Sequence, residues 1–424
     1  MVLFSLTLLL TDGFGFIPED AYVLQKTDML LLPTLYISYF EYKSNKKYFS
    51  VKHDKIGKTI CLILLFLLFE YVRTVLFRID SPIWAFKVIR VQLIFIVYFY
   101  LRKLDIKIWE RYIHLVLIFT VVQGILFYLQ PLGITGILAT DIDNTVDNVR
   151  YRNYPIFTPF FVIYFIVKSG ISPIKRMGIL LFFGYMLLLT QIRGIVLGLA
   201  GSLTLLLYLQ RNRKSLVYLT IGVGVYFLLI SPMIQKRDNE NIGGSTKDDI
   251  TLIINSSIAD LSEMKAGQFG TAAFRLGMLA ERWMYLVDNP EYMLFGVGCI
   301  HEQSPANRFR FYFGTKNEKF DYGRCMIESG DITWVPLLLR YGAIGVFIFL
   351  LLLITWFNYS RKNYFKIPLM ASKTSGLMAV YISIGSIDGA LFDASTSLIL
   401  LCIYLGLTVA RNTPNVKPQM NYTK

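Results

Sequence analysis

The chain has 424 residues, of which 54% are hydrophobic and only 17% are charged, and its mean hydropathy is +0.50. A soluble globular chain carries about a quarter charged residues, so the composition excludes an ordinary soluble enzyme. The net charge of +14 would suggest nucleic-acid binding in a soluble protein. Here the placement of the lysines and arginines assigns it to membrane topology, and we expect no nucleic-acid partner.

Long apolar stretches recur along the chain, and about 20 such residues make one membrane-spanning helix. They predict an all-α fold: a polytopic transmembrane helix bundle of about twelve spans with one large, partly helical extracytoplasmic loop. The stretches are residues 2–16, 22–40, 56–76, 83–101, 112–129, 156–167, 177–189, 194–209, 215–230, 332–357, 369–387 and 395–410. Residues 1–230 then hold spans one to nine, 231–330 the loop, and 331–424 the last three spans and a cytoplasmic tail.

Basic residues alternate in density from one short loop to the next, and loops rich in them stay in the cytoplasm. Counted from a cytoplasmic N-terminus, the inside segments carry Lys43, Lys46, Lys47, Lys52, Lys55, Lys58, Arg102, Lys103, Lys107, Arg111, Lys168, Lys175, Arg176, Arg211, Arg213, Lys214, Arg361, Lys362, Lys366, Lys373, Arg411, Lys417 and Lys424. The outside loops carry fewer: Arg73, Arg78, Arg150, Arg152 and Arg193. Both termini are therefore expected in the cytoplasm, and the large loop outside.

Cysteine and histidine chemistry is sparse. Cys299 and Cys325 both lie in the large loop, where a disulfide is chemically permitted, although we favour two unlinked thiols. The three histidines lack zinc-ligand spacing, so we expect no metal and no cofactor. Asp141 and Asp143 form an acidic motif like that of nucleotide-sugar glycosyltransferases, but the topology places it outside, and we interpret it as a polar loop.

Cationic side chains in or beside the spans gather on the outer side. An ionisable residue there is costly and is a functional hypothesis by default. Lys87 and Arg90 are three apart in the fourth span and share a helix face. Arg150 and Arg152 precede the sixth span, and Arg193 opens the eighth. The simpler alternatives are snorkelling of the first pair to lipid headgroups and ion pairing of the second with nearby aspartates.

Two further arginines lie on a helix that the sequence predicts over residues 271–287 of the loop. Arg275 and Arg282 are seven residues apart and share a face, about 10 Å from each other. Guanidinium groups bind phosphate oxygens bidentately, so the outer cations predict a phosphate or pyrophosphate site. The apolar face of this helix is expected to pack on the membrane domain and roof a cavity, and consists of Leu276, Ala280, Trp283 and Val287.

Four segments of the chain are distinctive by their order and by the side of the membrane on which the predicted topology places them. They are 148–155 (NVRYRNYP), 190–197 (TQIRGIVL), 274–283 (FRLGMLAERW) with its following glycine turn at 295–298, and 329–342 (SGDITWVPLLLRYG) followed by Gly345. Together they resemble the O-antigen polymerase and ligase superfamily, the Wzy-type and ligase-type membrane glycosyltransferases of bacterial envelopes. Ligases usually carry a histidine where this chain has Asp331, and an acidic residue there looks more like the polymerases.

The resemblance implies an inner-membrane glycosyltransferase that polymerises repeat units carried on undecaprenyl pyrophosphate, for O-antigen, capsule or exopolysaccharide. It implies Asp331 as general base, with Glu328 second, while an N-cap of the tenth span is the alternative role for Asp331. Arg193 would also stabilise the leaving group. Membrane lipids and a chain-length regulator protein are the further partners expected. The implied pyrophosphate-binding residues are Arg193, Arg275, Arg282, Arg150, Arg152, Lys87 and Arg90.

Alternative functions remain open at the level of sequence. An O-antigen ligase or a cell-wall transglycosylase also combines many spans with a large outer loop. A lipid-linked oligosaccharide flippase would lack a single loop of this size, and a non-enzymatic sensor would leave the outer arginines unexplained. His301, after the glycine turn, is a second candidate for the catalytic base, although a solvated loop histidine is the simpler interpretation.

Overall fold

Every regular element among the described residues of the computed structural model is a helix, which confirms the predicted all-helical class for that part of the chain. The structure describes residues 2–12, 26–134, 154–190, 193–210, 251, 255, 257, 271–309, 311, 327, 332–367, 369–387, 389, 391–392 and 394–410. The helices are α1 Val2–Leu10, α3 Lys26–Ser44, α4 Lys55–Leu76, α5 Pro82–Ile89, η2 Gln92–Ile96, α6 Val97–Leu101, α7 Ile106–Leu129, η3 Gln130–Leu132, α8 Thr158–Val167, α9 Pro173–Leu189, α10 Arg193–Gln210, α14 Thr271–Asp288, η4 Pro290–Tyr292, α15 Trp334–Asn363, α16 Met370–Gly385 and α17 Ser395–Thr408.

Three helices are long and apolar enough to cross a membrane: α4, α7 together with η3, and α15. The predicted fourth span is broken into α5 and the η2–α6 segment, which bend by 51° and make a fourth candidate if counted as one span. At the break, Gln92 is buried and accepts a hydrogen bond from the Tyr341 hydroxyl at 3.1 Å. Length and composition thus support three or four spans within the described residues, and the full set of about twelve stays a prediction.

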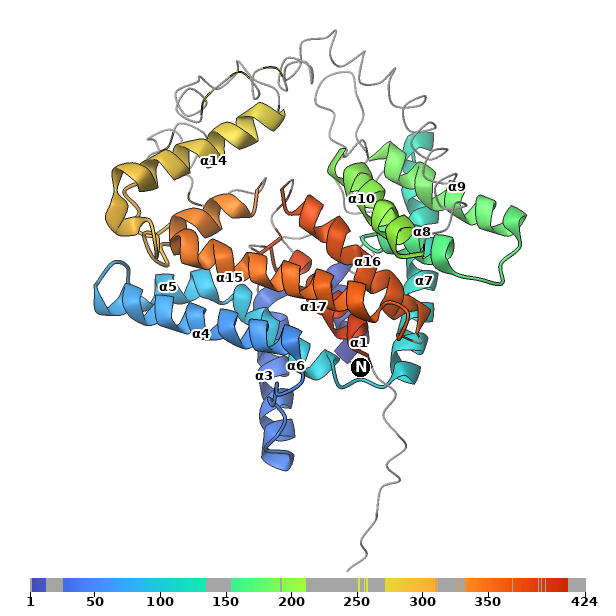
Figure 1. Cartoon of the computed structure of the whole chain (residues 1–424), viewed down its shortest axis with the longest axis horizontal. Helices are drawn as coiled ribbons and strands as arrows, with labels where there is room; N and C mark the ends of the chain where they lie inside the picture. The colour runs from blue at the N-terminus through green and yellow to red at the C-terminus, as the bar shows by residue number, and fades with distance from the viewer. Residues whose placement is uncertain are drawn as a thin grey trace, which may run out of the picture.

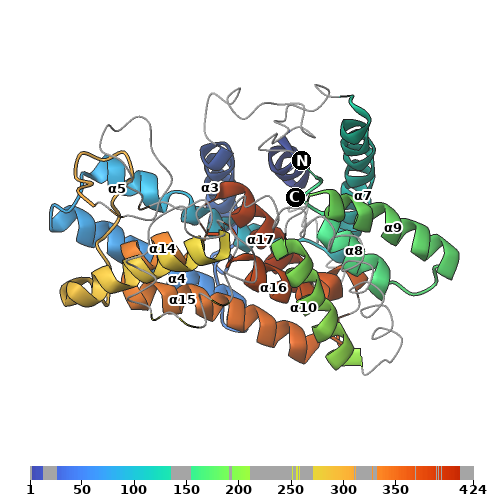
Figure 2. The ribbon, with the colours of Figure 1, turned by 90° about the horizontal axis from the view of Figure 1, so that it is seen from above.

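The helices do not all share one direction. In Figure 1, α4 and most of α15 run along the long axis of the molecule, whereas α3 and α7 run across it. α4 and α15 pack antiparallel, because Thr59 lies 3.5 Å from Thr355 near one end while Phe66 contacts the Tyr341 ring towards the other. Figure 2 shows α14 beside α15 at one side and α10 beside α16 at the other.

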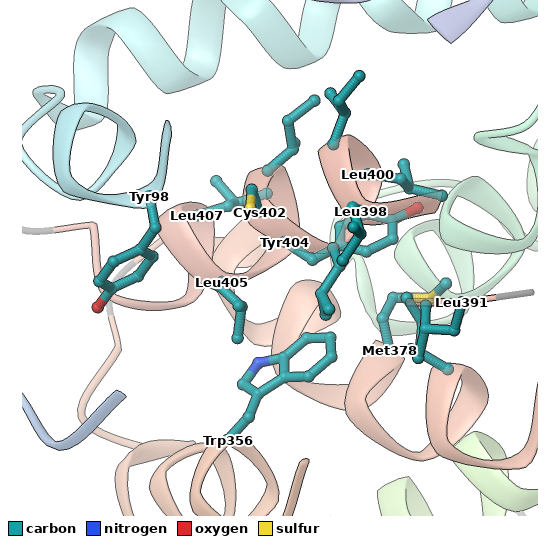
Figure 3. Close-up of a cluster of buried hydrophobic side chains, with 14 of the residues drawn as sticks. Tyr98, Trp356, Met378, Leu391, Leu398, Leu400, Cys402, Tyr404, Leu405 and Leu407 are labelled. Carbon is teal, nitrogen blue, oxygen red and sulfur yellow. The ribbon is translucent and has the colours of Figure 1, made fainter. Parts of the chain in front are cut away.

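The centre of the core is α17, which is buried from Leu398 through Thr408 (Figure 3). Its apolar side chains meet Trp356 of α15 and Met378 of α16. Two of the buried polar groups around α17 are paired across helices: Trp356 Nε1 donates to Thr408 Oγ1 at 3.0 Å, and Ser375 Oγ donates to the Tyr404 carbonyl at 2.6 Å. Such pairing is what allows polar atoms to be buried without a large desolvation cost.

Two of the predicted inside segments, around residues 45–55 and 98–105, contact each other. Asp54 caps α4 by accepting from the Gly57 amide at 2.8 Å, and it also accepts from the Tyr98 hydroxyl. Arg102 forms an ion pair with Asp54 at 2.7 Å and donates to the Tyr48 carbonyl at 2.8 Å. The two segments therefore lie beside each other, an arrangement compatible with the predicted placement of both loops on one side of a membrane.

The loop helix is confirmed as α14, which ends at Asp288; the backbone and side-chain amides of Asn289 then donate back to the Tyr285 carbonyl. The predicted packing face was wrong. Leu276 and Trp283 are each 38% exposed and Val287 is 44% exposed; only Ala280 of that set is buried. The buried residues of the other face are Met278, Arg282 and Leu286. The apolar face of α14 is exposed because the opposite face, which carries Arg282, is the buried one. Inside, Arg282 is stabilised by the Glu281 carboxylate and the Phe311 ring.

Candidate functional site

α15 is folded back on itself at Gly342. The backbone of Gly342 has φ 61° and ψ −162°, which is not helical and which favours glycine. Trp334 lines the same groove as Leu353 and Phe357. In a straight helix, 19 residues would separate Trp334 from Leu353 by about 28 Å. The helix therefore forms a hairpin, with residues 334–341 as one arm and 343–363 as the other. The sequence predicts one continuous span over 332–357 instead.

The glycine turn of the large loop interlocks with the tip of this hairpin. Four backbone hydrogen bonds cross the junction, from Val297 N to Leu339 O at 2.9 Å, Gly298 N to Arg340 O at 3.0 Å, Ala343 N to Met293 O at 2.9 Å and Ile344 N to Leu294 O at 3.1 Å. Gly296 also has positive φ, and a Cβ there would meet the Arg340 backbone at 2.4 Å. The junction thus satisfies the backbone groups that the break in α15 leaves open.

The C-terminal end of α4 is bonded to the same junction. Arg73 donates to the Phe295 carbonyl at 2.8 Å and forms an ion pair with the buried Glu70 at 2.7 Å. The Cys299 amide donates to Thr74 Oγ1 at 2.9 Å. Burial, reinforced by the nearby Glu70 carboxylate, raises the pKa of the Cys299 thiol to about 12. Cys299 is a free thiol, and Cys325 lies outside the described residues.

The start of the hairpin contacts the first half of α14. Met278, Ile332 and Val335 form one buried cluster, with Phe274 packed against it. Arg275 follows Phe274 and is half-buried, so it belongs to this end of α14. Asp331 and Glu328 lie outside the described residues. Their neighbours on either side, Ile327 and Ile332, are both buried.

α10 reaches the same region through small residues packed on α16. A Cβ added at Gly198 would clash with Tyr381, and one added at Gly201 would clash with Ile384, so these glycines allow close approach. Ser202 Oγ donates to the Leu377 carbonyl at 3.0 Å. Since 198 lies beside 381 and 202 beside 377, the two helices are antiparallel. The same register brings the N-terminus of α10, at residue 193, level with the C-terminal end of α16; the Arg193 side chain itself lies outside the described part.

The arginine-bearing segment before α8 also arrives at α16. The Tyr154 hydroxyl lies near the Tyr381 hydroxyl, and the two groups interact. Arg150 and Arg152 lie outside the described residues, but Tyr154 follows Arg152 by two positions. Three segments that are distant in sequence therefore meet along the second half of α16. They are the segment before α8, the helix α10 and the start of α15.

An apolar groove of about 350 Å³ runs between α15 and α16 at this meeting point. We call the end of the groove at Trp334 its mouth; there, Trp334 Nε1 donates to Ser386 Oγ at 3.2 Å. The groove is lined by Trp334, Leu350, Leu353, Ile354, Phe357, Val380, Ser383, Ile384, Ser386 and Ile387. Leu350 and Ile354 are also exposed on the outer surface of α15, so the groove opens where a membrane-spanning helix would face lipid.

The remaining candidate cations take other partners. Arg282 is fully buried, where it bonds Glu281 at 2.7 Å and stacks over the Phe311 ring at 4.3 Å. Arg90 is paired with Asp28 of α3 at 2.9 Å. These contacts give Arg282 and Arg90 structural roles.

Lys87 belongs to a polar cluster that the sequence analysis missed. Its ammonium lies 3.7 Å over the Trp84 ring, and the His301 ring lies 4.9 Å from the same tryptophan. Asp80 accepts from Ser304 Oγ at 2.7 Å and holds the loop beside them. Arg340 donates to the Ile300 carbonyl at 3.1 Å. The sequence identified Lys87 and His301 as candidates, whereas the roles of Asp80 and Arg340 depend on contacts with the distant 300–304 segment.

Comparison with protein-family models and with curated proteins gives no match. Within the described part of the chain, no group of three histidine, cysteine or carboxylate side chains is placed to hold a metal ion. The site is therefore argued on its own chemistry: an apolar groove whose mouth adjoins helix ends that carry Arg193 and Arg275 in the sequence. Such an arrangement suits an amphiphile with an anionic headgroup and a hydrocarbon chain.

Proposed function

We propose that the chain is a bacterial inner-membrane glycosyltransferase that polymerises undecaprenyl-pyrophosphate-linked oligosaccharide repeat units at the outer face of the cytoplasmic membrane. This proposal includes the finer topology of about twelve spans, both termini in the cytoplasm, and residues 231–330 outside. The product would be O-antigen, capsule or exopolysaccharide.

One observation carries the proposal. The segments that resemble the polymerase and ligase superfamily are far apart in the sequence, yet their described parts converge on the C-terminal half of α16: Tyr154 on Tyr381, Gly198 on Tyr381, and Trp334 on Ser386. α14 joins them through the Met278–Val335 contact. Convergence of this kind is expected of a shared active site and is not required of unrelated surface features.

In the proposed reaction the acceptor hydroxyl oxygen attacks the anomeric carbon of the donor sugar. A new glycosidic bond forms, the bond from that carbon to the pyrophosphate oxygen breaks, and undecaprenyl pyrophosphate leaves. Asp331, or Glu328 as the second candidate, takes the hydroxyl proton. Arg193, Arg275 and Arg152 stabilise the negative charge that develops on the leaving group.

The groove between α15 and α16 supplies the apolar half of the donor site. Its walls are hydrocarbon except for Ser383 and Ser386 near the mouth. A polyprenyl chain lying in it would bring its pyrophosphate to Trp334, next to the N-terminus of α10. The positive end of a helix dipole adds to the attraction for that anion.

The test is the glycan ladder of a deletion strain complemented with variants. Arg193→Ala should collapse the ladder to single repeat units on the lipid anchor, and Arg193→Lys should rescue poorly because the fork is lost. Asp331→Asn should be equally inactive but should still bind the lipid donor. Arg361→Ala, an exposed arginine at the other end of α15, serves as control and should leave the ladder intact. A normal ladder in Arg193→Ala contradicts the proposal, and accumulation of unattached polymer would indicate a ligase.

A further inference from the structure

A second groove, remote from the candidate active site, lies between α3, α4 and the η2–α6 segment. Its volume is about 510 Å³, within the range of about 300–1,000 Å³ that is usual for ligand sites. Nearly all of its walls are hydrocarbon or aromatic. The lining residues are Leu35, Ser38, Tyr39, Tyr42, Phe49, Cys61, Leu64, Leu65, Ile96 and Phe99.

The shape of the groove suits one hydrocarbon chain. It follows α3 from Leu35 to Tyr42, which is about 10 Å at 1.5 Å per residue. Its edge residues are exposed: Leu65 is 65% exposed and Tyr39 is 61% exposed. These edges continue the apolar outer surface of α4, one of the helices able to cross a membrane. The groove is thus open sideways to the lipid phase.

One end of the groove is rimmed with lysines. Lys46 Nζ lies 4.8 Å from the centre of the Tyr42 ring, and Tyr42 stands 6.0 Å from Phe49, so an ammonium adjoins two lining rings. Lys103 Nζ lies 3.9 Å over Tyr48, the neighbour of Phe49. The exposed basic side chains at this rim are Lys43, Lys46, Lys47 and Lys103.

The rim stays positive after its acidic neighbours are counted. Arg102 is neutralised by its ion pair with Asp54. Glu41 is exposed and interacts electrostatically with Lys103. Lys46 and Lys103, with the exposed Lys43 and Lys47 beside them in sequence or structure, therefore outnumber the one glutamate. This end is also the one that the lysine and arginine count assigns to the cytoplasm, where the leaflet carries anionic lipid.

We propose that this groove binds one anionic glycerophospholipid of the cytoplasmic leaflet, with an acyl chain between α3 and α4 and its phosphate at Lys46 and Lys103. The site is separate from the proposed polymerase reaction and would hold whether or not that reaction is correct. A second copy of the chain would not explain the lysine rim, and a zwitterionic lipid would gain little from it.

The groove contains its own reporter. Cys61 lines it and is partly exposed, whereas Cys299 and Cys402 are buried. The purified protein is reconstituted in nanodiscs of phosphatidylcholine alone or with phosphatidylglycerol added, and modification of Cys61 by N-ethylmaleimide is followed by peptide mass spectrometry. A resident phosphatidylglycerol should slow the modification several-fold. Equal rates in the two kinds of nanodisc overturn the proposal.

Charge is tested by native mass spectrometry in an equimolar mixture of the two lipids. The wild type should retain phosphatidylglycerol preferentially. Each of Lys46→Gln and Lys103→Gln should reduce that preference roughly fivefold, the factor for one basic residue at an anionic lipid surface. The matched control changes Lys362 and Lys366, two exposed lysines that follow the apolar part of α15. This control variant should retain the wild-type preference for phosphatidylglycerol. An unchanged preference in the Lys46 and Lys103 variants contradicts the site.

Two matched bulky substitutions distinguish lipid bound in this groove from the lipid that surrounds any membrane protein. Leu65→Trp places a bulky ring at the groove edge, whereas Leu68→Trp makes the same change one turn along α4, where Leu68 is 56% exposed and does not line the groove. Only Leu65→Trp should reduce phosphatidylglycerol retention. Equal effects of the two variants would mean that bulk lipid alone occupies this surface.

Discussion

Replacing Gly342 by alanine should loosen the junction between the large loop and the α15 hairpin. At φ 61° and ψ −162°, the backbone lies in a region that is costly for other residues, by about 1–3 kcal/mol. The added Cβ would lie 2.6 Å from Gly296 N and from the Leu294 carbonyl, so the loop backbone must move. The hydrogen bonds from Ala343 and Ile344 would weaken, at about 1 kcal/mol each. The expected loss is about 3–5 kcal/mol.

The assay is the thermal midpoint of the detergent-solubilised protein, with maleimide labelling of Cys299 as a local probe. Gly342→Ala should lower the midpoint and expose Cys299, which the intact junction buries. Gly184→Ala is the control: a Cβ there meets no atom within 4 Å, and alanine favours its helix by up to about 1 kcal/mol. A wild-type midpoint together with a protected Cys299 in Gly342→Ala would refute the interlocked-turn argument.

Three further predictions concern charges and a thiol near the same helices. Arg73→Gln should cost about 2–4 kcal/mol, because it leaves the Glu70 carboxylate buried beside carbonyls that have lost their donor; the double change with Glu70→Gln should recover part of this in a thermal-shift cycle. Arg90→Gln should cost under about 1 kcal/mol, since its partner Asp28 is 26% exposed and solvent screens the pair; a larger fall in the same assay would mean a more deeply buried pair. Cys299 should resist maleimide at neutral pH in the folded protein, because its pKa is raised and the reactive thiolate appears only as the pH approaches about 12; ready labelling without unfolding would contradict this.

The local elements were predictable because their causes are local. The helix at 271–287 follows from its apolar spacing and from the Asn289–Pro290 stop, and α14 matches it within one residue. α4 and α7 follow from apolar runs long enough to cross a membrane. These predictions needed only neighbouring residues, so no knowledge of distant contacts was required.

The outward turn of α14 was not predictable, because periodicity finds an apolar face without saying what covers it. The helix instead buries the opposite face, where Arg282 is held by Glu281 and Phe311. The second of these partners lies 29 positions away across a loop of irregular structure. A sequence alone gives an arginine no such neighbour, and exposure is the default expectation for it.

The hairpin turn of α15 was also not predictable, because it too depends on contacts with residues that are distant in the sequence. Gly342 sits in an apolar run that a helix tolerates, and only its contact with Leu294 and Gly296 makes the turn necessary. The candidate site shares this limit. Sequence motifs named Arg193 and Arg275 as candidates, but the convergence on Tyr381 and Ser386 depends on the packing of α10 and α15 against α16.

The burial of α17 has a consequence for biogenesis. Every other described helix precedes α17 in the chain, yet α17 is buried from Leu398 through Thr408 and supplies the middle of the core (Figure 3). If the chain is inserted into a membrane as it is made, as we propose, the earlier helices enter the bilayer before their central partner exists. The position of Leu398 to Leu407 would then be filled by lipid tails, which α17 must displace when the ribosome releases it. Closure of this core should therefore wait for α17, and quality-control proteases would meet an incomplete core until α17 is in place.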